Sequence, residues 1–159
     1  MKKLFLFLAV AALGFTSCSD DDDNNNPTYT TGGTVTMKIN GVQKTYTTIS
    51  VDRELYTGET PGDDEYLLSV TASENGSATE FVTFDIWENS NGAGGIDWIT
   101  YVTDGDNYSQ WGNFNSNVLA SNNHELGANF SGEMIIGYDE NNDLVVDEIT
   151  EGSINVTYE

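Results

Sequence analysis

Apolar and polar residues alternate along most of this chain, and this period of two constrains its fold more than any other feature. In the segment 34–40, Val35, Met37 and Ile39 fall on one side of an extended strand, with threonines and Lys38 on the other. Because successive side chains of a strand point to opposite faces, the pattern predicts a strand with one buried face. No period of 3.6 residues follows residue 17, so helices are not expected there.

Turn residues separate the alternating segments in the manner of β-hairpins. Asn40-Gly41 is the strongest short hairpin signal, and Glu74-Asn75-Gly76-Ser77 divides a second pair of strands. Strands at this spacing predict an all-β fold, an antiparallel sandwich or barrel of about eight strands, without indicating whether the sheet closes. The predicted strands are 34–40, 42–51, 66–72, 79–87, 96–103, 107–114, 126–138, 144–149 and 151–158.

The first residues, MKKLFLFLAVAALGFTSC, have the layout of an export signal. Lys2 and Lys3 supply positive charge, an apolar run extends from Leu4 to Phe15, and small residues follow. The apolar run is too short for a membrane helix, which needs roughly 20 residues. Residues 1–17 are therefore predicted to be a cleaved signal peptide.

Phe15-Thr16-Ser17-Cys18 resembles the lipobox of bacterial lipoproteins, although Phe15 stands where leucine is usual. The resemblance implies that a lipid is attached to Cys18, which is the chain's single cysteine and so forms no internal disulfide. Ser19, Asp20, Asp21, Asp22 and Asp23 follow at once, like the tag that directs Bacteroidetes-type lipoproteins to the outer face of the outer membrane. The alternative is that this run is only a solvated acidic linker.

The remaining chain divides into a linker and one domain. Residues 18–33 are polar and acidic and cannot bury a core, so a disordered linker is expected there. Residues 34–159 have the length of a single domain. Their opening KINGV and closing NFSGEM and ITEGSINVTY segments resemble small Bacteroidetes lipoprotein domains of unknown function, which implies a fold but no activity.

The chain is strongly acidic, with 26 acidic and five basic residues and a net charge of −21. Loss of Lys2 and Lys3 with the signal peptide makes the mature chain more acidic still. No basic patch is available for nucleic acid, so nucleic acid is excluded as a partner. An anionic lipid surface is disfavoured for the same reason, which leaves the lipid anchor as the expected contact with the membrane.

Catalytic patterns are weak in this sequence. The single histidine, His124, lies in a polar stretch that predicts a solvated loop, and no GxSxG-type elbow accompanies it. Zinc needs three or four nitrogen or sulfur ligands, which one histidine and a lipidated cysteine do not supply. The chain is therefore predicted not to be an enzyme and to need no cofactor, and a small hydrolase using paired carboxylates is the weakest of the hypotheses.

Calcium is the one metal that the sequence favours. Asp139, Asn141 and Asp143 place oxygen side chains at alternate positions, as in the first half of an EF-hand loop. Leu144 replaces the turn glycine and Thr150 the closing glutamate of that loop. A polar hairpin loop between two strands is the preferred interpretation of this segment.

Aromatic residues gather between residues 87 and 114. Trp87 lies on the strand face opposite Val82 and Phe84, Tyr101 on the face opposite Trp98, and Trp111 in a polar segment. Trp87, Tyr101 and Trp111 are therefore predicted candidates for an exposed, sugar-binding surface. Burial in the core is the preferred alternative, because aromatic residues dominate β cores energetically.

These observations favour a lipoprotein of the outer membrane that faces the cell exterior. Its β domain is predicted to bind an extracellular ligand such as a glycan without catalysing a reaction. The alternative is a structural or interaction lipoprotein that docks on a partner protein of the envelope.

Overall fold

The structure is a computed structural model that describes residues 28, 29, 31–60, 62–104 and 106–159. Within these ranges every regular element is a strand, in agreement with the predicted all-β class. The strands are β1 (Thr28–Tyr29), β2 (Thr31–Ile39), β3 (Val42–Tyr46), β4 (Thr48–Tyr56), β5 (Glu65–Ser73), β6 (Glu80–Trp87), β7 (Gly92–Ala93), β8 (Ile96–Thr103), β9 (Asp106–Ser121), β10 (Glu125–Tyr138) and β11 (Leu144–Tyr158).

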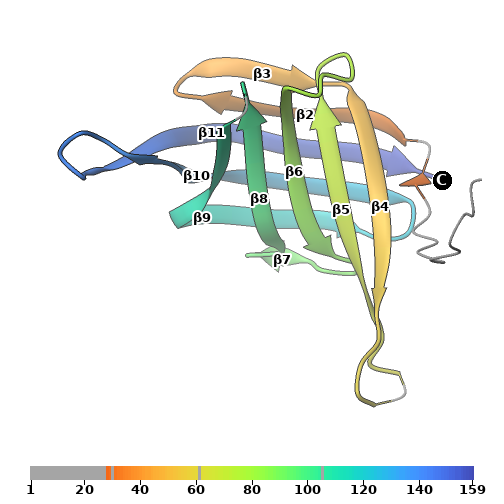
Figure 1. Cartoon of the computed structure of the whole chain (residues 1–159). Helices are drawn as coiled ribbons and strands as arrows, with labels where there is room; N and C mark the ends of the chain where they lie inside the picture. Colours follow the sequence, from red (N-terminus) through yellow and green to blue (C-terminus); the bar gives the residue numbers. More distant parts are fainter. Residues whose placement is uncertain (1–27, 30, 61, 105) are drawn as a thin grey trace, which may run out of the picture.

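All the strands belong to one antiparallel sheet that folds over on itself. The order is β1-β4-β5-β6-β8-β9-β10-β11-β2-β3, and β7 pairs with β9. Figure 1 shows a front layer of β4, β5, β6 and β8 crossing a rear layer formed by β9, β10, β11, β2 and β3. The ends of the order, β1 and β3, do not pair, so the sheet is a two-layer sandwich and not a closed barrel.

Strand β9 carries the sheet from the front layer to the rear layer. Its first residues, Asp106 to Ser109, pair with β8, and the stretch from Ser109 to Ser121 pairs with β10. Gly112, three residues beyond the change of partner and within the part that pairs with β10, has a φ of 38°, in the left-handed region that glycine adopts readily. This bend turns the sheet's apolar face onto itself.

The core lies between the two layers and follows the predicted alternation. Val35, Met37 and Ile39 of β2 are buried, as predicted. Val82, Phe84 and Ile86 of β6 are buried together, as are Ile154, Val156 and Tyr158 of β11. The apolar face of each strand therefore meets the other layer.

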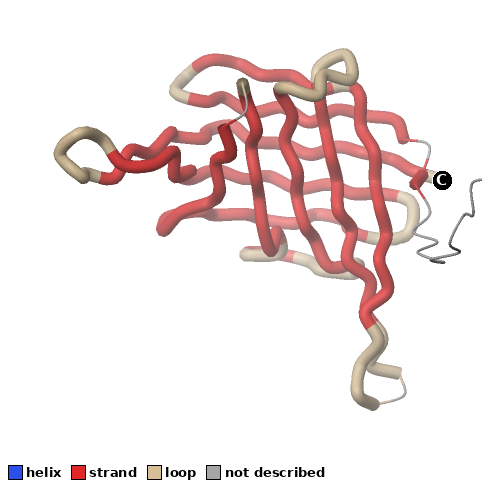
Figure 2. The backbone as a smooth tube through the Cα atoms, viewed as in Figure 1, coloured by secondary structure: helices blue, strands red, loops and turns tan. Residues whose placement is uncertain are grey.

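Two of the hairpin turns have the geometry that their sequences predict. Asn40 and Gly41 have φ values of 49° and 78°, and Asn75 and Gly76 have values of 52° and 72°. Consecutive residues with positive φ form the turn whose twist matches antiparallel strands, and Asn-Gly tolerates it best. Figure 2 shows the loops at the ends of the strands, with the β4–β5 and β10–β11 hairpins projecting from the body of the domain.

The predicted facing of β8 is wrong. Alternation placed Tyr101 on an exposed face opposite Trp98, but Tyr101 is 4% exposed and Trp98 is 45% exposed. The cause is a β-bulge, because Asp85 pairs with Trp98 whereas Ile86 pairs with Ile96. Asp97 is thus an extra residue that reverses the facing of the following side chains.

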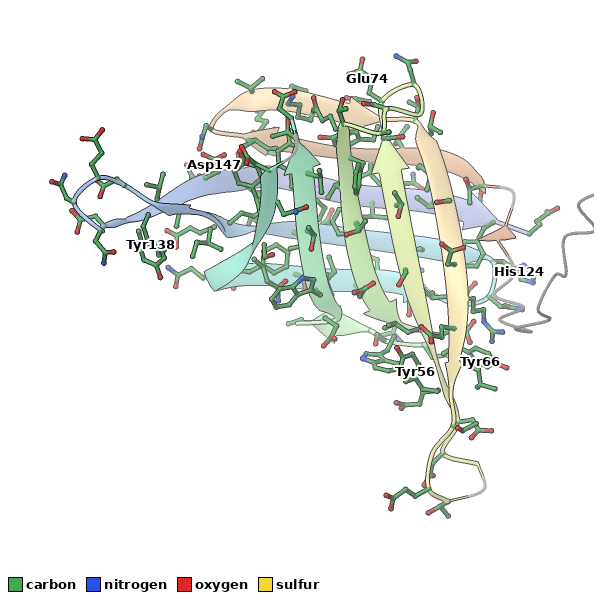
Figure 3. All side chains as sticks on the ribbon, viewed as in Figure 1. Tyr56, Tyr66, Glu74, His124, Tyr138 and Asp147 are labelled. Atoms are coloured by element: carbon green, nitrogen blue, oxygen red, sulfur yellow. The ribbon has the colours of Figure 1, made fainter. Side chains whose placement is uncertain are left out.

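Tyr138 at the end of β10 departs from simple alternation. It lies four residues after the buried Met134, yet it is 64% exposed. The register of β10 against β11 shifts between Ile135 and Gly137, so the strand bends at this point. The far part of the β10–β11 hairpin therefore extends beyond the core (Figure 3).

Strand structure begins before the predicted domain boundary at Thr34. Thr28 and Tyr29 pair with Asp52 and Val51 of β4, and β2 starts at Thr31. The glycines of this segment allow close pairing, since a Cβ on Gly33 would lie 2.1 Å from the carbonyl oxygen of Asn155. The segment assigned to the linker thus contributes to the sheet from Thr28 onward.

A polar cluster around Glu80 joins the two layers at one end of the core. Oε1 of Glu80 accepts hydrogen bonds from Lys44 Nζ at 2.7 Å, Tyr101 OH at 3.3 Å and Tyr46 OH at 3.4 Å. Lys44 and Tyr46 come from β3 of the rear layer, while Glu80 and Tyr101 belong to the front layer. The hydrogen bond from Lys44 is the main cause that lowers the pKa of Glu80 from its ordinary value of 4.5.

The Glu80→Gln variant should unfold more easily than the parent chain. The charged acceptor of three donors is lost, which costs about 1–3 kcal/mol in the free energy of unfolding near pH 7. Because the folded pKa of Glu80 is lowered, its contribution is complete above pH 4.5 and is lost as the pH falls through the folded value. Urea unfolding between pH 7 and pH 3 should therefore show the two proteins converging in acid.

Glu74→Gln is the matched control, since Glu74 is exposed at the β5–β6 turn (Figure 3). This control should unfold within about 0.5 kcal/mol of the parent at every pH, as surface substitutions usually do. An equal loss in both variants would contradict the role assigned to Glu80.

Candidate ligand-binding surface

The outer face of the front layer carries the residues most suited to contact a ligand. Val51, Leu68 and Ile86 face the core, so their neighbours along each strand face solvent. Two rows of outward side chains cross the layer side by side. One row is Glu54–Leu67–Trp87, and the other is Asp52–Ser69–Asp85–Trp98.

Trp87 is half-buried and packs against Tyr56. The two ring centroids are 5.2 Å apart at an interplanar angle of 74°, an edge-to-face arrangement. Tyr56 is 44% exposed at the end of β4. The contact fixes the orientation of the indole while leaving both rings open to solvent on the outer face.

Trp98 extends the aromatic surface onto β8. Its Nε1 donates a hydrogen bond to Thr100 Oγ1 at 3.1 Å, which orients the indole along its own strand. Trp98 pairs with Asp85, and Trp87 lies two residues beyond Asp85 on β6. Diagonal neighbours of this kind are within reach of aromatic side chains. We call Tyr56, Trp87 and Trp98 the aromatic platform.

Hydrogen-bonding groups accompany the aromatic platform. Asp85 Oδ1 accepts a hydrogen bond from Ser69 Oγ at 2.7 Å, and Glu54 Oε2 accepts one from Tyr56 OH at 3.3 Å. The nearby charge of Glu54 is the main cause that raises the pKa of Tyr56. The phenol is therefore kept protonated and able to donate.

A hollow of about 660 Å³ adjoins Trp87 at the base of the β4–β5 hairpin. It is open to solvent and its walls are mostly polar and acidic. Asp64 helps to shape this wall, because its Oδ1 accepts a hydrogen bond from the Gly58 amide at 3.2 Å. The lining residues are Gly62, Asp63, Asp64, Glu65, Trp87, Glu88, Asn89 and Ser90.

An ion pair on the opposite face of the hairpin supports this end of the front layer. Arg53 contacts Glu88 through Nε–Oε1 at 3.0 Å and Nη2–Oε2 at 2.7 Å, and its guanidinium carbon lies 3.1 Å from the centroid of the Tyr66 ring. The Glu88 side chain is only 8% exposed, and its hydrogen bonds raise the pKa of Arg53. Figure 3 shows Tyr56 and Tyr66 on opposite sides of the β4–β5 pair.

The structure separates the three aromatic residues predicted as ligand contacts. Trp87 lies on the outer face as predicted, but the predicted exposure of Tyr101 is wrong, because its ring is buried and its hydroxyl contacts Glu80. The side chain of Trp111 lies outside what the structure describes. Sequence reasoning missed Trp98, whose facing depends on the bulge, and Tyr56, which ends β4 beyond the predicted strand.

The segment proposed for calcium forms the β10–β11 hairpin loop. Asp139 Oδ1 accepts the backbone N–H groups of Asn141 at 2.9 Å and Asp143 at 2.8 Å, and these hydrogen bonds lower the pKa of Asp139. This is the local bonding of a polar hairpin loop. Among the described residues, no three or more His, Cys, Asp or Glu side chains gather as a metal site. Calcium binding at Asp139, Asn141 and Asp143 stays a prediction.

Other predicted features lie at the margins of the domain or beyond the described ranges. His124 is exposed in the β9–β10 loop, beside a hollow of about 510 Å³ that includes Thr31 and Glu159. Cys18 and the acidic run Ser19 to Asp23 fall outside the described residues. Within the described part of the chain, no helix has the length and apolarity needed to cross a membrane.

The Arg53→Lys variant should lower the free energy of unfolding by about 1–3 kcal/mol, because a lysine cannot make both hydrogen bonds to the poorly exposed Glu88. Lys38→Arg is the control, since Lys38 pairs with Glu151, whose side chain is 67% exposed. Exposed ion pairs contribute little, so this control should stay within about 0.5 kcal/mol of the parent. Urea unfolding at pH 7 measures both, and equal effects would contradict the supporting role of Arg53.

No protein-family model matches this chain, and no curated protein or solved structure matches it at a significant level. A proposal for its function therefore has to be argued from the chemistry of its own residues.

Proposed function

We propose that this chain is a surface-facing lipoprotein of the outer membrane whose β domain binds a glycan through the aromatic platform, without catalysing a reaction. The export signal, Cys18 and the acidic run after it support the location. The exposed rings of Tyr56 and Trp98 beside Trp87 carry the proposal for the ligand. Large apolar side chains that gather on the surface of a domain mark an interaction site.

The platform combines the two kinds of contact that a sugar needs. Indole and phenol rings offer flat apolar surface to the C–H face of a sugar ring, and their polar tips remain able to bond. Asp85, Ser69 and Glu54 lie among the rings and offer acceptors and donors to sugar hydroxyls. A binding site of mainly apolar surface with a few placed polar groups is the usual arrangement for small ligands.

The distribution of positive charge favours a glycan without acidic groups. Each lysine and arginine in the described ranges is bound to a carboxylate, in the pairs Lys38–Glu151, Lys44–Glu80 and Arg53–Glu88. A sulfated or uronic acid polymer would thus meet carboxylates on the platform and gain no free cation there. Repulsion between like charges should exclude such polymers.

Docking on a protein of the envelope is the second candidate function. Strand β3 is at the end of the strand order, and Val42 at its start is 61% exposed. Such an edge can accept a strand from a partner. The edge is short, however, and the inward-directed Lys44 is a feature that limits edge-to-edge pairing.

The full chain should bind one or more neutral glycans on a glycan array, and Trp87→Ala or Trp98→Ala should weaken that binding. Loss of one aromatic contact is expected to cost about 1–2 kcal/mol, or roughly tenfold in the dissociation constant. Tyr138→Ala is the control, because Tyr138 is also an exposed aromatic residue but lies on the distant β10–β11 hairpin (Figure 3). Glycan binding that survives both tryptophan substitutions would refute the role of the aromatic platform. An array without signal would leave docking on an envelope protein as the candidate function.

The Cys18→Ala variant should not incorporate labelled fatty acid and should not be recovered as an anchored lipoprotein. Replacing Asp20 to Asp23 with alanine should leave the lipid in place but protect the domain from protease added to whole cells. Fatty-acid labelling and protease accessibility measure the two effects. Normal lipid labelling of Cys18→Ala would disprove the lipobox. Unchanged protease accessibility of the variant without the aspartates would show that the acidic run is only a linker.

A further inference from the structure

The outer face of the rear layer has a composition unlike the rest of this acidic chain. Asparagines occupy outward positions on three neighbouring strands, and all of them are exposed. β9 supplies three, β10 one and β11 one. The residues are Asn113, Asn115, Asn117, Asn129 and Asn155.

Asparagine is an unfavourable residue for these positions. It is depleted in strands, because its short amide competes for backbone hydrogen bonds and packs poorly on a pleated surface. Asn117 and Asn129 face each other directly across β9 and β10. Within the described part of the chain neither side chain has a hydrogen-bond partner, so the fold gains no internal bond from them. Their amide groups are left free for an external partner.

These amides belong to a row of uncharged polar side chains that crosses the whole rear layer. Asn117 pairs with Asn129, Asn129 with Ser153, Ser153 with Thr36, and Thr36 with Thr45. Adjacent strands lie about 4.8 Å apart, so the row presents donors and acceptors at a regular spacing. We call this row, which consists of Asn117, Asn129, Ser153, Thr36 and Thr45, the amide row.

Two hollows adjoin each other beside the amide row. One has a volume of about 490 Å³, and Asn115, Asn117, Asn129 and Ser153 line it with carbonyl, amide and hydroxyl groups. The other, of about 430 Å³, includes Asn113, and Ser131 lines both. The surface is therefore hollowed along a path that crosses strands β9, β10 and β11.

Charge selects the class of ligand for this surface. The chain has a net charge of −21, yet the amide row carries no charged side chain. Glu151, which lines the first hollow, forms an ion pair with Lys38, and Glu133 and Glu148 line the second hollow, so an anionic polymer would be repelled there. Amides and hydroxyls that both donate and accept fit a partner with many hydroxyl groups and no charge.

We propose that the amide row and its adjoining hollows are a second binding surface, on which an uncharged polysaccharide lies across the strands. This surface is on the rear layer and the aromatic platform is on the front layer, with the core between them (Figure 1). It is independent of the aromatic platform and does not rest on the function proposed for it. Occupancy of one surface leaves the other accessible.

Electrophoresis of the full chain in native gels that contain a neutral polysaccharide tests this proposal. The probes are hydroxyethyl cellulose, laminarin, dextran and yeast mannan, with mobility compared to that in a gel without sugar. At least one probe should retard the chain, and Asn117→Asp or Asn129→Asp should weaken binding at least tenfold. Every chain in this experiment also carries Trp87→Ala and Trp98→Ala, so the aromatic platform does not contribute to the retardation. Unchanged mobility of this platform-free chain in all four gels would overturn the proposal.

The control is Asn123→Asp, which makes the same change of charge at an exposed position in the β9–β10 loop. Asn123→Asp should bind the retarding probe as the parent does. If Asn117→Asp and Asn123→Asp weakened polysaccharide binding equally, the effect would be one of net charge alone. That result would overturn the proposal that the amide row binds the polysaccharide.

A second pair of measurements separates ligand binding from a structural role. Asn117→Val and Asn129→Val together remove the amides and improve strand propensity, so the melting temperature should rise by about 2–4 °C while probe binding falls at least tenfold. A melting temperature that falls would show that the amides stabilise the fold, and probe binding that persists would show that they do not contact the ligand. Either result would overturn the proposal.

Discussion

The bend of β9 is the constraint on which the rest of this structure depends. A sheet with one apolar face can bury that face only against another layer, and this sheet supplies both layers itself. The change of partner along β9, from β8 to β10 at Ser109, together with the bend that follows at Gly112, brings the apolar faces of the two layers together. The same bend leaves each layer with one outward face, and the polar cluster of Glu80 with Lys44 holds the layers together at the end of the core.

Local sequence was sufficient for the strands and their turns, but not for the surfaces proposed to bind ligands. Alternation located the buried faces of β2, β6 and β11, and Asn40-Gly41 located a turn, because both signals depend on adjacent residues. The bulge at Asp97 depends on the register of β8 against β6, so the facing of Trp98 and Tyr101 was assigned the wrong way round. The amide row joins strands whose order is set by distant pairings, which local sequence does not encode.

The two outward faces divide the chemistry of the surface between them. Carboxylates accompany aromatic rings on the front layer, whereas the amide row of the rear layer offers neutral amides and hydroxyls. Each lysine and arginine in the described ranges takes part in an ion pair with a carboxylate. Packing of the core and the proposed binding of ligands therefore use different sides of the same strands.

The position of β11 has a consequence for the order in which the domain assembles. This strand, Leu144–Tyr158, lies between β10 and β2, and it joins Ile149 to Ile39 across most of the domain's length. The hairpins encoded by local turns can form early, but the rear layer has a gap at its centre until the last strand arrives. Pairings between residues so far apart in sequence form slowly. The rear layer is thus complete only when β11 has paired with both β10 and β2.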